Sequence, residues 1–399
     1  MMAIAAGADK GRKDSVVAKQ AEKVGAQETA VFKIKSVQTW RAVLRRAVAW
    51  KTARYTKGDI EATVVGITDT NGTTGYGYMP SMSIVGESPL SSEALIQGLL
   101  VSVMKDRSFF GIQPILRETD QVLGANFQTK FAIEEALWDL LGKKLHTPLV
   151  NLIGGACRQE VPVMRMLGLK PPQETAGEAK ALVDRGYRHV KVKIGLDEKR
   201  DVETVRRARD AVGKEVFLSA DANQAYAPMQ AVRVLRQLED ANLGLVEQPV
   251  RRDDIRGMAF VRQNVSVPIM ADEGIETATD ALRHIEAGAM DAVSIKIWKM
   301  GGLYRSQEIA SVCRAANVSV HVGSTAGSQL MEAIQLHFCA ALPELFGGAE
   351  ISEFESLTND PAAGLVVENG ALRVPNVPGL GVAIDHGKLR ETTGLWGGK

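Results

Sequence analysis

The chain contains little cysteine, and its three cysteines are far apart. Cys157, Cys313 and Cys339 form no Cys-x-x-Cys pair. Structural zinc sites and thiol redox motifs need closely spaced cysteines, and small disulfide-linked proteins need many more of them. We therefore expect isolated thiols in a reducing compartment and predict a cytoplasmic protein.

A surplus of charge and a long hydrophobic run are also missing. The 399 residues include 48 basic and 47 acidic side chains, which gives a formal net charge of +1. Such a chain has no overall field that would attract nucleic acid or an anionic membrane. No apolar run reaches the roughly 18 residues needed to cross a bilayer. The sequence therefore predicts neither a nucleic-acid partner nor a membrane partner.

The first segment of the chain, 1–29, is rich in alanine and basic residues. Asp9, Asp14 and Glu22 interrupt it, and it has no long apolar core. Both features argue against an export signal. We predict an N-terminal extension that lies outside the folded domains.

Five short apolar runs lie between residues 189 and 300, and each ends in a charged side chain. These side chains are Lys193, Asp221, Glu247, Asp272 and Lys296, separated by 28, 26, 25 and 24 positions. Because amphipathic segments lie between the runs, the pattern is typical of parallel βαβ units. Residues at the C-terminal ends of barrel strands point into one mouth, where barrel enzymes perform their chemistry. We therefore predict that these five side chains share a site.

The region before these runs has a different pattern, which predicts an α+β domain over 30–155. Asn71-Gly72 between two apolar alternations indicates a hairpin, because the favoured turn needs positive φ at both central residues. The strands are predicted at 32–37, 60–68 and 75–78, with a longer variable stretch at 38–58. Helices are predicted at 91–104, 113–123 and 130–144.

The barrel is predicted over 156–356, and it is followed by a segment without barrel-type helices. Further barrel strands are expected at 161–167, 318–323 and 349–355. The segment 357–399 has strand and turn character, including a second hairpin signal at Asn369-Gly370. We expect this segment to return to the N-terminal domain.

These motifs, taken together, resemble the enolase superfamily, in the muconate lactonizing enzyme subgroup of the mandelate racemase/muconate lactonizing enzyme family. The resemblance covers about residues 30–390. Its fold would be α/β, a modified TIM barrel (β/α)7β with an α+β capping domain that the C-terminal segment completes. The matching motifs are Lys191-Val192-Lys193, Asp221-Ala222-Asn223, Glu247-Gln248-Pro249, Ala271-Asp272-Glu273, Lys296, Ala136-Leu137-Trp138-Asp139, Gly154-Gly155 and Pro378-Gly379-Leu380-Gly381.

The resemblance implies one Mg²⁺ held by Asp221, Glu247 and Asp272. Carboxylates without cysteine or histidine are hard oxygen ligands that fit Mg²⁺ or Mn²⁺ and disfavour Zn²⁺. Asn223 and Glu273 would support these ligands. The competing interpretation is that the carboxylates cap helices or pair with arginines.

The resemblance also places Lys193 and Lys296 on opposite sides of the substrate as acid and base. Lysine is protonated at neutral pH, but the neighbouring Lys191 ammonium and a divalent ion would lower its pKa. Lysine bases working beside Mg²⁺ that stabilises an enediolate are a known pattern in this superfamily. The chain lacks the histidine–aspartate pair of mandelate racemases, since Lys296 stands where they have aspartate. It also lacks the usual glutamate after Gly75-Tyr76-Gly77, where Tyr78 stands instead.

The expected reaction is abstraction of the α-proton of a small-molecule carboxylate, by an isomerase. We favour racemisation or epimerisation of an amino acid derivative, such as an N-acyl amino acid, a dipeptide or a proline-type compound. Two alternative activities remain open, a muconate-like cycloisomerase and a dehydratase of a β-hydroxy acid. A non-catalytic family member kept for binding or scaffolding is a third alternative. A homo-oligomer is the state that the family suggests.

The expected substrate contacts come from the last part of the barrel. Strand alternation predicts that Trp298 points to the same side as Lys296, and Glu353 and Glu355 would face a substrate ammonium from the eighth strand. Glu350 could replace one of them if the register differs by a residue. His321 on the seventh strand is expected to line the barrel or its mouth. In the competing interpretation, Trp298 packs against a helix and the glutamates pair with arginines.

Overall fold

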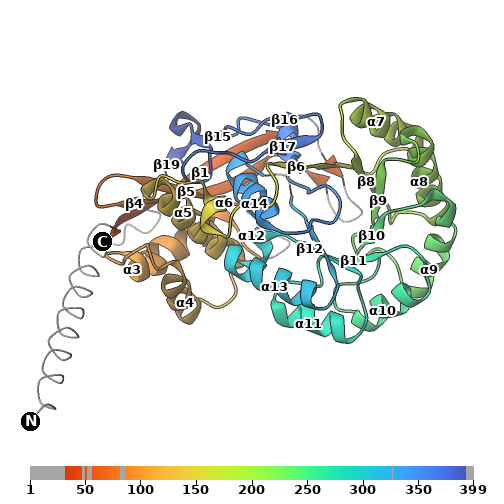
Figure 1. Ribbon diagram of the computed structural model, residues 1–399, viewed down its shortest axis with the longest axis horizontal. Helices are drawn as coiled ribbons and strands as arrows, with labels where there is room; N and C mark the ends of the chain where they lie inside the picture. Colours follow the sequence, from red (N-terminus) through yellow and green to blue (C-terminus); the bar gives the residue numbers. More distant parts are fainter. Residues whose placement is uncertain (1–31, 47–49, 52–55, 81–85, 326, 392–399) are drawn as a thin grey trace, which may run out of the picture.

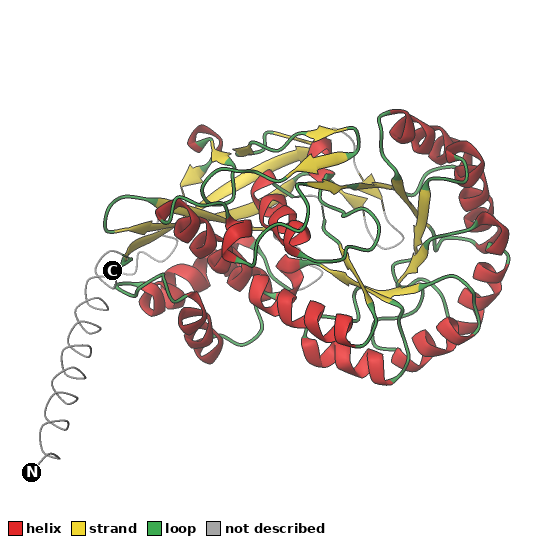
Figure 2. Cartoon of the chain, viewed as in Figure 1, coloured by secondary structure: helices red, strands yellow, loops and turns green. Residues whose placement is uncertain are grey.

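The computed structural model describes residues 32–46, 50–51, 56–80, 86–325 and 327–391. They form an antiparallel sheet with helices packed against it and a barrel of parallel strands ringed by helices (Figures 1 and 2). The predicted extension 1–29 lies outside the described residues. Within the described part of the chain, every helix is too short or too polar to span a bilayer.

The capping sheet is built on three antiparallel strands, β1 (Ile34–Arg46), β4 (Ile60–Asp69) and β5 (Thr74–Met79). The turn between β4 and β5 lies at the predicted Asn71-Gly72, where Gly72 has a φ of 89°. The Asp69 side chain accepts hydrogen bonds from the backbone N–H groups of Asn71 and Thr73, at 2.9 and 2.8 Å. The prediction of a variable stretch from residue 38 was wrong as far as Arg46, because β1 continues to that residue.

Two-residue strands continue this region at β2 (Trp50–Lys51) and β3 (Thr56–Lys57), which pair with each other. The helices of the capping domain then follow. They are α2 (Pro89–Leu95), the π-helix η2 (Ile96–Leu100), α3 (Val101–Met104), α4 (Ile112–Val122), α5 (Phe127–Lys144) and α6 (Leu149–Leu152).

Helix α5 packs closely on strand β5, and glycines make this approach possible. A Cβ atom on Gly77 would lie 1.9 Å from the carbonyl oxygen of Ala132, and one on Gly75 would lie 2.2 Å from that of Ala136. Both distances are far inside van der Waals contact, so only glycine fits at these two strand positions. The result is a buried helix that connects the capping sheet to the barrel.

Seven parallel strands form the barrel sheet in the order β13-β12-β11-β10-β9-β8-β7. They are β7 (Met164–Leu167), β8 (His189–Lys193), β9 (Phe217–Asp221), β10 (Leu245–Glu247), β11 (Ile269–Ala271), β12 (Ala292–Ile295) and β13 (Ser319–Val322). The outer helices are α7 (Pro172–Asp184), α8 (Glu198–Val212), α9 (Pro228–Arg236), α10 (Ile255–Gln263), α11 (Ala278–Glu286), α13 (Leu303–Ala315) and α14 (Gln329–Ala341).

Residues around Ala349 close the barrel between β7 and β13. Ala349 forms a parallel bridge with Val163, and the Glu350 N–H donates to the Val322 carbonyl at 2.9 Å. The prediction of a strand over 349–355 was too long. A turn of 3₁₀-helix, η4 (Glu353–Ser356), begins where the strand was expected to continue.

The segment after the barrel pairs with the capping sheet. Strands β14 (Leu357–Thr358) and β19 (Arg390–Glu391) both pair with β1. Between them, β16 (Val367–Glu368) and β17 (Ala371–Arg373) form the expected hairpin, which pairs with β6 (Glu160–Pro162). The short strands β15 (Ala362–Ala363) and β18 (Ala383–Ile384) pair with each other.

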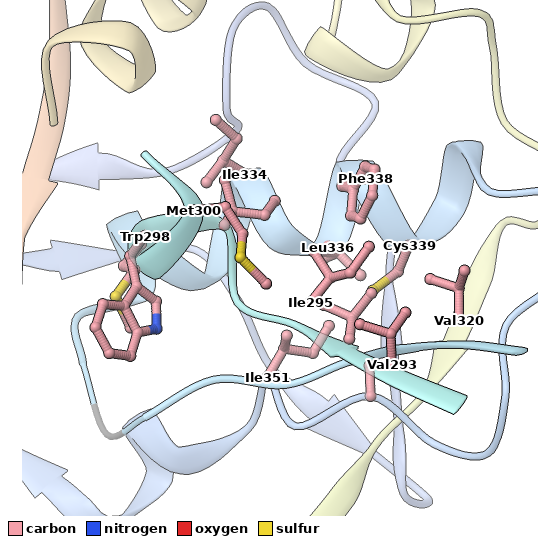
Figure 3. Close-up of a cluster of buried hydrophobic side chains, with 14 of the residues drawn as sticks. Val293, Ile295, Trp298, Met300, Val320, Ile334, Leu336, Phe338, Cys339 and Ile351 are labelled. Carbon is pink, nitrogen blue, oxygen red and sulfur yellow. The ribbon is translucent and has the colours of Figure 1, made fainter. Parts of the chain in front are cut away.

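Alternation along β12 separates the outer core from the barrel interior. Val293 and Ile295 pack with Leu336 and Cys339 of α14 in a buried hydrophobic cluster (Figure 3). Successive strand side chains point to opposite faces, so Ser294 and Lys296 face the barrel interior. The same rule directs the charged residue at each strand end towards a common mouth.

Candidate active site

The five charged residues that the strand pattern singled out lie together at the C-terminal ends of adjacent strands. Lys193, Asp221 and Glu247 are the last residues of β8, β9 and β10. Asp272 and Lys296 follow β11 and β12 directly. In the parallel register, Asp221 stands opposite both Lys193 and Glu247.

Lys191 lies deeper in the barrel and contacts three carboxylates. Its Nζ donates to Glu350 Oε2 at 2.8 Å and to Glu247 Oε2 at 3.0 Å, and it lies 3.6 Å from Asp221 Oδ2. Burial lowers the pKa of Lys191, but attraction by these carboxylates outweighs burial and holds the pKa well above its ordinary value. Lys191 is therefore a fixed positive charge beneath the site.

Lys193 forms one side of the mouth with Asp221 and Asn223. Its Nζ donates to Asp221 Oδ2 at 2.5 Å and to Asn223 Oδ1 at 2.8 Å. The Asn223 side-chain amide donates to Glu273 Oε1 at 3.3 Å, and its backbone N–H donates to Asp221 Oδ1 at 2.9 Å. Asn223 thus connects Glu273, the other residue predicted to support the ligands, with Asp221.

Lys296 forms the other side of the mouth with Asp272. Its Nζ donates to Asp272 Oδ2 at 2.5 Å and lies 3.9 Å from Glu247 Oε1. The other Asp272 oxygen, Oδ1, accepts from buried Lys299 Nζ at 2.9 Å, and the same Nζ donates to the Asp272 carbonyl at 2.5 Å.

Lys299 is a residue of the site that was not predicted from the sequence. The spacing Lys-x-x-Lys was visible at Lys296 and Lys299. However, a strand that continued beyond Lys296 would have placed Lys299 on the other face. The chain instead turns into the one-turn helix α12 (Ile297–Met300), which brings both lysines to one side.

The carboxylates do not share one protonation behaviour. Burial raises the pKa of Glu247 to about 8, and repulsion by Asp221 adds to the effect. For Asp221 and Asp272, burial is outweighed by the adjacent lysines, so the pKa of each is lowered, that of Asp272 strongly. Burial, followed by repulsion from Asp272, raises the pKa of Glu273. The adjacent lysines therefore favour the ionised forms of Asp221 and Asp272, whereas burial disfavours the ionised forms of Glu247 and Glu273.

At Lys296, neighbouring carboxylates oppose the lowering of the pKa that was expected from Lys191 and a bound cation. Burial lowers its pKa, but Asp272 and Glu247 raise it by more, so the net direction is upward. The Lys191 ammonium group does lower the pKa of Lys296, as expected. The carboxylates that surround Lys296 come together only in the folded chain, so their opposing effect was not visible in the sequence.

The donor set fits a divalent metal. Glu247 Oε1 is buried without a hydrogen-bond partner in the described structure, and buried polar atoms normally have one. Within the residues described, no three acidic, histidine or cysteine side chains converge as a ready-made metal cluster, and Lys193 and Lys296 contact the Oδ2 atoms of Asp221 and Asp272. Asp221, Glu247 and Asp272 are the residues that could hold such a cation.

His321 lies in the barrel interior, one of the two positions expected for it. Its Nδ1 donates to the Phe346 carbonyl at 3.0 Å, and its ring centroid is 6.1 Å from that of His189. Burial, reinforced by the Lys191 charge, lowers the pKa of His321 to about 4. The imidazole is therefore neutral near pH 7.

The strand placement predicted for Trp298 was wrong. Trp298 lies in helix α12 because the chain leaves β12 at Ile295. The indole is buried at one end of the hydrophobic cluster with Met300 (Figure 3), and its Nε1 has no hydrogen-bond partner among the described residues. Its role in substrate binding stays a prediction.

The strand placement of Glu353 and Glu355 was also wrong, because both lie in η4. Glu355 accepts from Arg185 at 2.9 Å and from the Tyr187 hydroxyl. Glu353 Oε1 lies 3.7 Å from Arg165 NH1. Glu350 reaches the site by accepting a hydrogen bond from Lys191. Glu350 is the carboxylate that was expected in place of Glu353 or Glu355 if the register differed.

Tyr78, which stands where the family pattern has glutamate, is fully buried. Its N–H donates to Glu135 Oε2 of α5 at 2.6 Å. Burial raises the pKa of the Tyr78 phenol well above its ordinary value. This residue therefore ties β5 to α5 and is neutral.

Two family models match the chain and together cover most of it. The model described as "Mandelate racemase / muconate lactonizing enzyme, N-terminal domain" matches residues 35–154, and "Enolase C-terminal domain-like" matches residues 174–388. The chain belongs to this family of the enolase superfamily. Family membership and the fold class predicted from the strand-end motifs are both confirmed.

Curated relatives include epimerases, racemases and cycloisomerases. L-Ala-D/L-Glu epimerase of Bacillus subtilis is 31% identical over 88% of this chain and 97% of its own length. N-succinyl-L-Arg/Lys racemase of Bacillus cereus is 30% identical over 84% and 91%. Muconate cycloisomerase 1 of Rhodococcus opacus is 30% identical over 83% and 90%.

Solved structures agree with this grouping. Dipeptide epimerase from Enterococcus faecalis, complexed with Mg and the dipeptide L-Leu-L-Tyr, superposes with a TM-score of 0.85 at 30% identity, over 88% of this chain and 99% of that one. Muconate lactonizing enzyme from Pseudomonas fluorescens, complexed with muconolactone, gives 0.86 at 28% identity, over 90% and 98%. The chain is an enzyme whose relatives are isomerases, and membership implies a divalent metal.

Proposed function

We propose that this chain is a Mg²⁺-dependent racemase or epimerase acting on the α-carbon of an amino acid derivative. The observation that carries the proposal is the position of Lys193 and Lys296. Lys193 ends β8 and Lys296 directly follows β12, and these strands flank β9, β10 and β11, whose ends carry the three carboxylates. Two bases that face each other across one carbon can remove a proton on one face and return it on the other.

The roles proposed for individual residues follow from this arrangement. Asp221, Glu247 and Asp272 would hold Mg²⁺, for which Mn²⁺ could substitute. When bound, the metal would supply positive charge beside the substrate carboxylate, where negative charge develops as the α-proton leaves. Lys193 and Lys296 exchange roles as base and acid according to the enantiomer bound. Lys191 holds Glu247 and Glu350 in place.

The substrate proposed is an N-acyl amino acid, a dipeptide or a proline-type compound. This choice of substrate is supported by the similarity of the chain to epimerases and racemases named for dipeptides and N-succinyl amino acids. Glu353 and Glu355 add no support for a free ammonium group, since both are engaged by basic residues of this chain. The small-molecule carboxylate, the homo-oligomer and the cytoplasmic location remain proposals from sequence.

A cycloisomerase is the second candidate. Muconate cycloisomerases are similar to this chain over nearly the same length as the epimerases. Such an enzyme would use one lysine as the acid and would need no base on the opposite face. A dehydratase of a β-hydroxy acid would likewise use one lysine.

The test is α-proton exchange in D₂O, with N-acyl amino acids, dipeptides, proline derivatives and muconate as substrates. Racemisation with deuterium incorporation is expected for an amino acid derivative. Lys193→Ala and Lys296→Ala should each abolish racemisation, yet each should still exchange the α-proton of one enantiomer, a different one in each variant. Turnover of muconate without exchange on any amino acid derivative would instead establish the cycloisomerase.

A second experiment tests the metal ligands independently. Asp221→Asn should abolish turnover, because the neutral amide removes one of the three negative charges that would bind the cation. The far-UV circular dichroism should stay unchanged, since the substitution keeps the shape of the side chain. Full activity after treatment with EDTA would contradict the proposed metal dependence.

A further inference from the structure

A cavity of about 340 Å³ lies between the capping domain and the barrel, outside the ring of carboxylates and lysines. Helices α4 and α5 of the capping domain form one wall, and residues of α11 and α13 form the other. Helix α13 lies on the side of the barrel that faces α5 (Figure 1). The cavity has the size of a small-molecule site.

The charged groups in this cavity leave an excess of positive charge. Asp120 is shared by two cations, with Lys130 Nζ at 2.6 Å and Arg305 NH2 at 2.8 Å. Arg117 also lines the cavity, and no carboxylate pairs with it in the described structure. A guanidinium without a carboxylate is a ready donor to a planar anion, because its N–H groups match two oxygens at once.

The acidic side chains cancel only part of this charge. Glu134 is buried, and its Oε1 already accepts from Trp138 Nε1 and from the Tyr304 N–H, both at 3.0 Å. Burial raises the pKa of Glu134 to about 7, which removes part of its negative charge near neutral pH. Glu308 at the rim and Arg117 are both exposed to solvent, where salt screens the field of each to a similar degree.

An unpartnered hydroxyl is a second and independent sign of a ligand. Thr119 lines the cavity and is fully buried, yet its Oγ1 has no hydrogen-bond partner among the described residues. Buried polar groups are rarely left without a partner. Leu116, Ala278 and the ring of Tyr304 supply apolar wall beside it.

We propose that this cavity binds a small organic carboxylate with a compact apolar body. The carboxylate lies on Arg117 and Arg305, the apolar body contacts Leu116 and Tyr304, and one carboxylate oxygen accepts from Thr119. The occupant bridges helices of the capping domain and of the barrel. It also touches Gly301 and Tyr304, which follow Lys296 by five and eight positions, so it contacts the segment that carries a proposed catalytic lysine.

The test uses benzoate as the probe, titrated into the full-length protein by isothermal calorimetry after treatment with EDTA. Saturable binding at one site is expected below about 10 mM. Arg117→Gln should weaken it by at least about tenfold, the loss of a charged hydrogen bond, and Thr119→Val by about threefold, the loss of a neutral one. Arg256→Gln removes an exposed charge on α10 and should change nothing. Arg117→Lys should restore part of the affinity.

Two further arms separate this site from the barrel mouth and from simple anion binding. Lys193→Met should leave benzoate binding intact, and a loss in that variant would place benzoate in the barrel mouth and overturn the proposal. Inorganic phosphate should bind more weakly than benzoate because it has no apolar body. Equal binding of phosphate, no saturable benzoate binding, or wild-type affinity in both Arg117→Gln and Thr119→Val would each refute the assignment.

Discussion

Glu134 of α5 is a buried carboxyl group whose protonation should control how stability varies with pH. It accepts hydrogen bonds from Trp138 and Tyr304, but burial still raises its pKa from 4.5 to about 7. Between these values the native state retains a proton that the unfolded chain releases. The free energy of unfolding therefore falls as pH rises through this window, by about 3 kcal/mol in total, since one pKa unit corresponds to about 1.36 kcal/mol.

Replacing Glu134 by Gln removes the titration and keeps the shape and an acceptor oxygen. At pH 5 the variant and the wild type should have similar stability, because the wild-type carboxyl group is largely protonated there. At pH 8 the wild type carries a buried charge, so the variant should be more stable by about 3 kcal/mol.

Urea unfolding at pH 5 and pH 8, at matched ionic strength, measures this difference. The matched control is Glu215→Gln, which neutralises an exposed glutamate and should show no pH-dependent gain. The reasoning is refuted if the difference between Glu134→Gln and the wild type is the same at both pH values.

Two further predictions concern the site and the packing that supports it. Lys299→Met removes the hydrogen bond that orients Asp272 Oδ1 and should weaken Mg²⁺ binding by about 10- to 100-fold. Calorimetric titration with Mg²⁺ measures this without using activity, and unchanged affinity would show that Lys299 does not position the ligand. Gly77→Ala drives a methyl group into the Ala132 carbonyl and should cost about 3 kcal/mol or more. Urea unfolding checks it against Gly98→Ala, a position with no atom within 4 Å of the added Cβ, and equal losses in the two variants would contradict the packing argument.

Much of the proposed site was predictable because the rule that places it is local. A parallel strand directs its last side chain to the mouth of the barrel, so Asp221 and Glu247 could be found from the apolar runs before them. The turn at Asn71-Gly72 was equally accessible, since it depends on the φ that two residues adopt. In both cases, a few neighbouring residues determine the result.

The errors came where the chain changes direction without a local signal. Helix α12 begins directly after Lys296, with no proline or glycine before it, so alternation was extended too far and misplaced Trp298. The same error extended the eighth strand to Glu355. In β1, arginines and adjacent apolar residues such as Val43-Leu44 interrupt the strict alternation after residue 38, and pairing with β4 stabilises a strand that this irregular pattern did not indicate.

The capping sheet requires both ends of the described chain, which affects how the protein can fold. Trp40 of β1 pairs with Glu391 of β19, and the whole barrel lies between these partners in sequence. Bringing such distant segments together costs chain entropy that short-range contacts do not. The barrel can form while β1 still lacks its C-terminal partners. The sheet can only be completed after the whole barrel and then β19 have been synthesised.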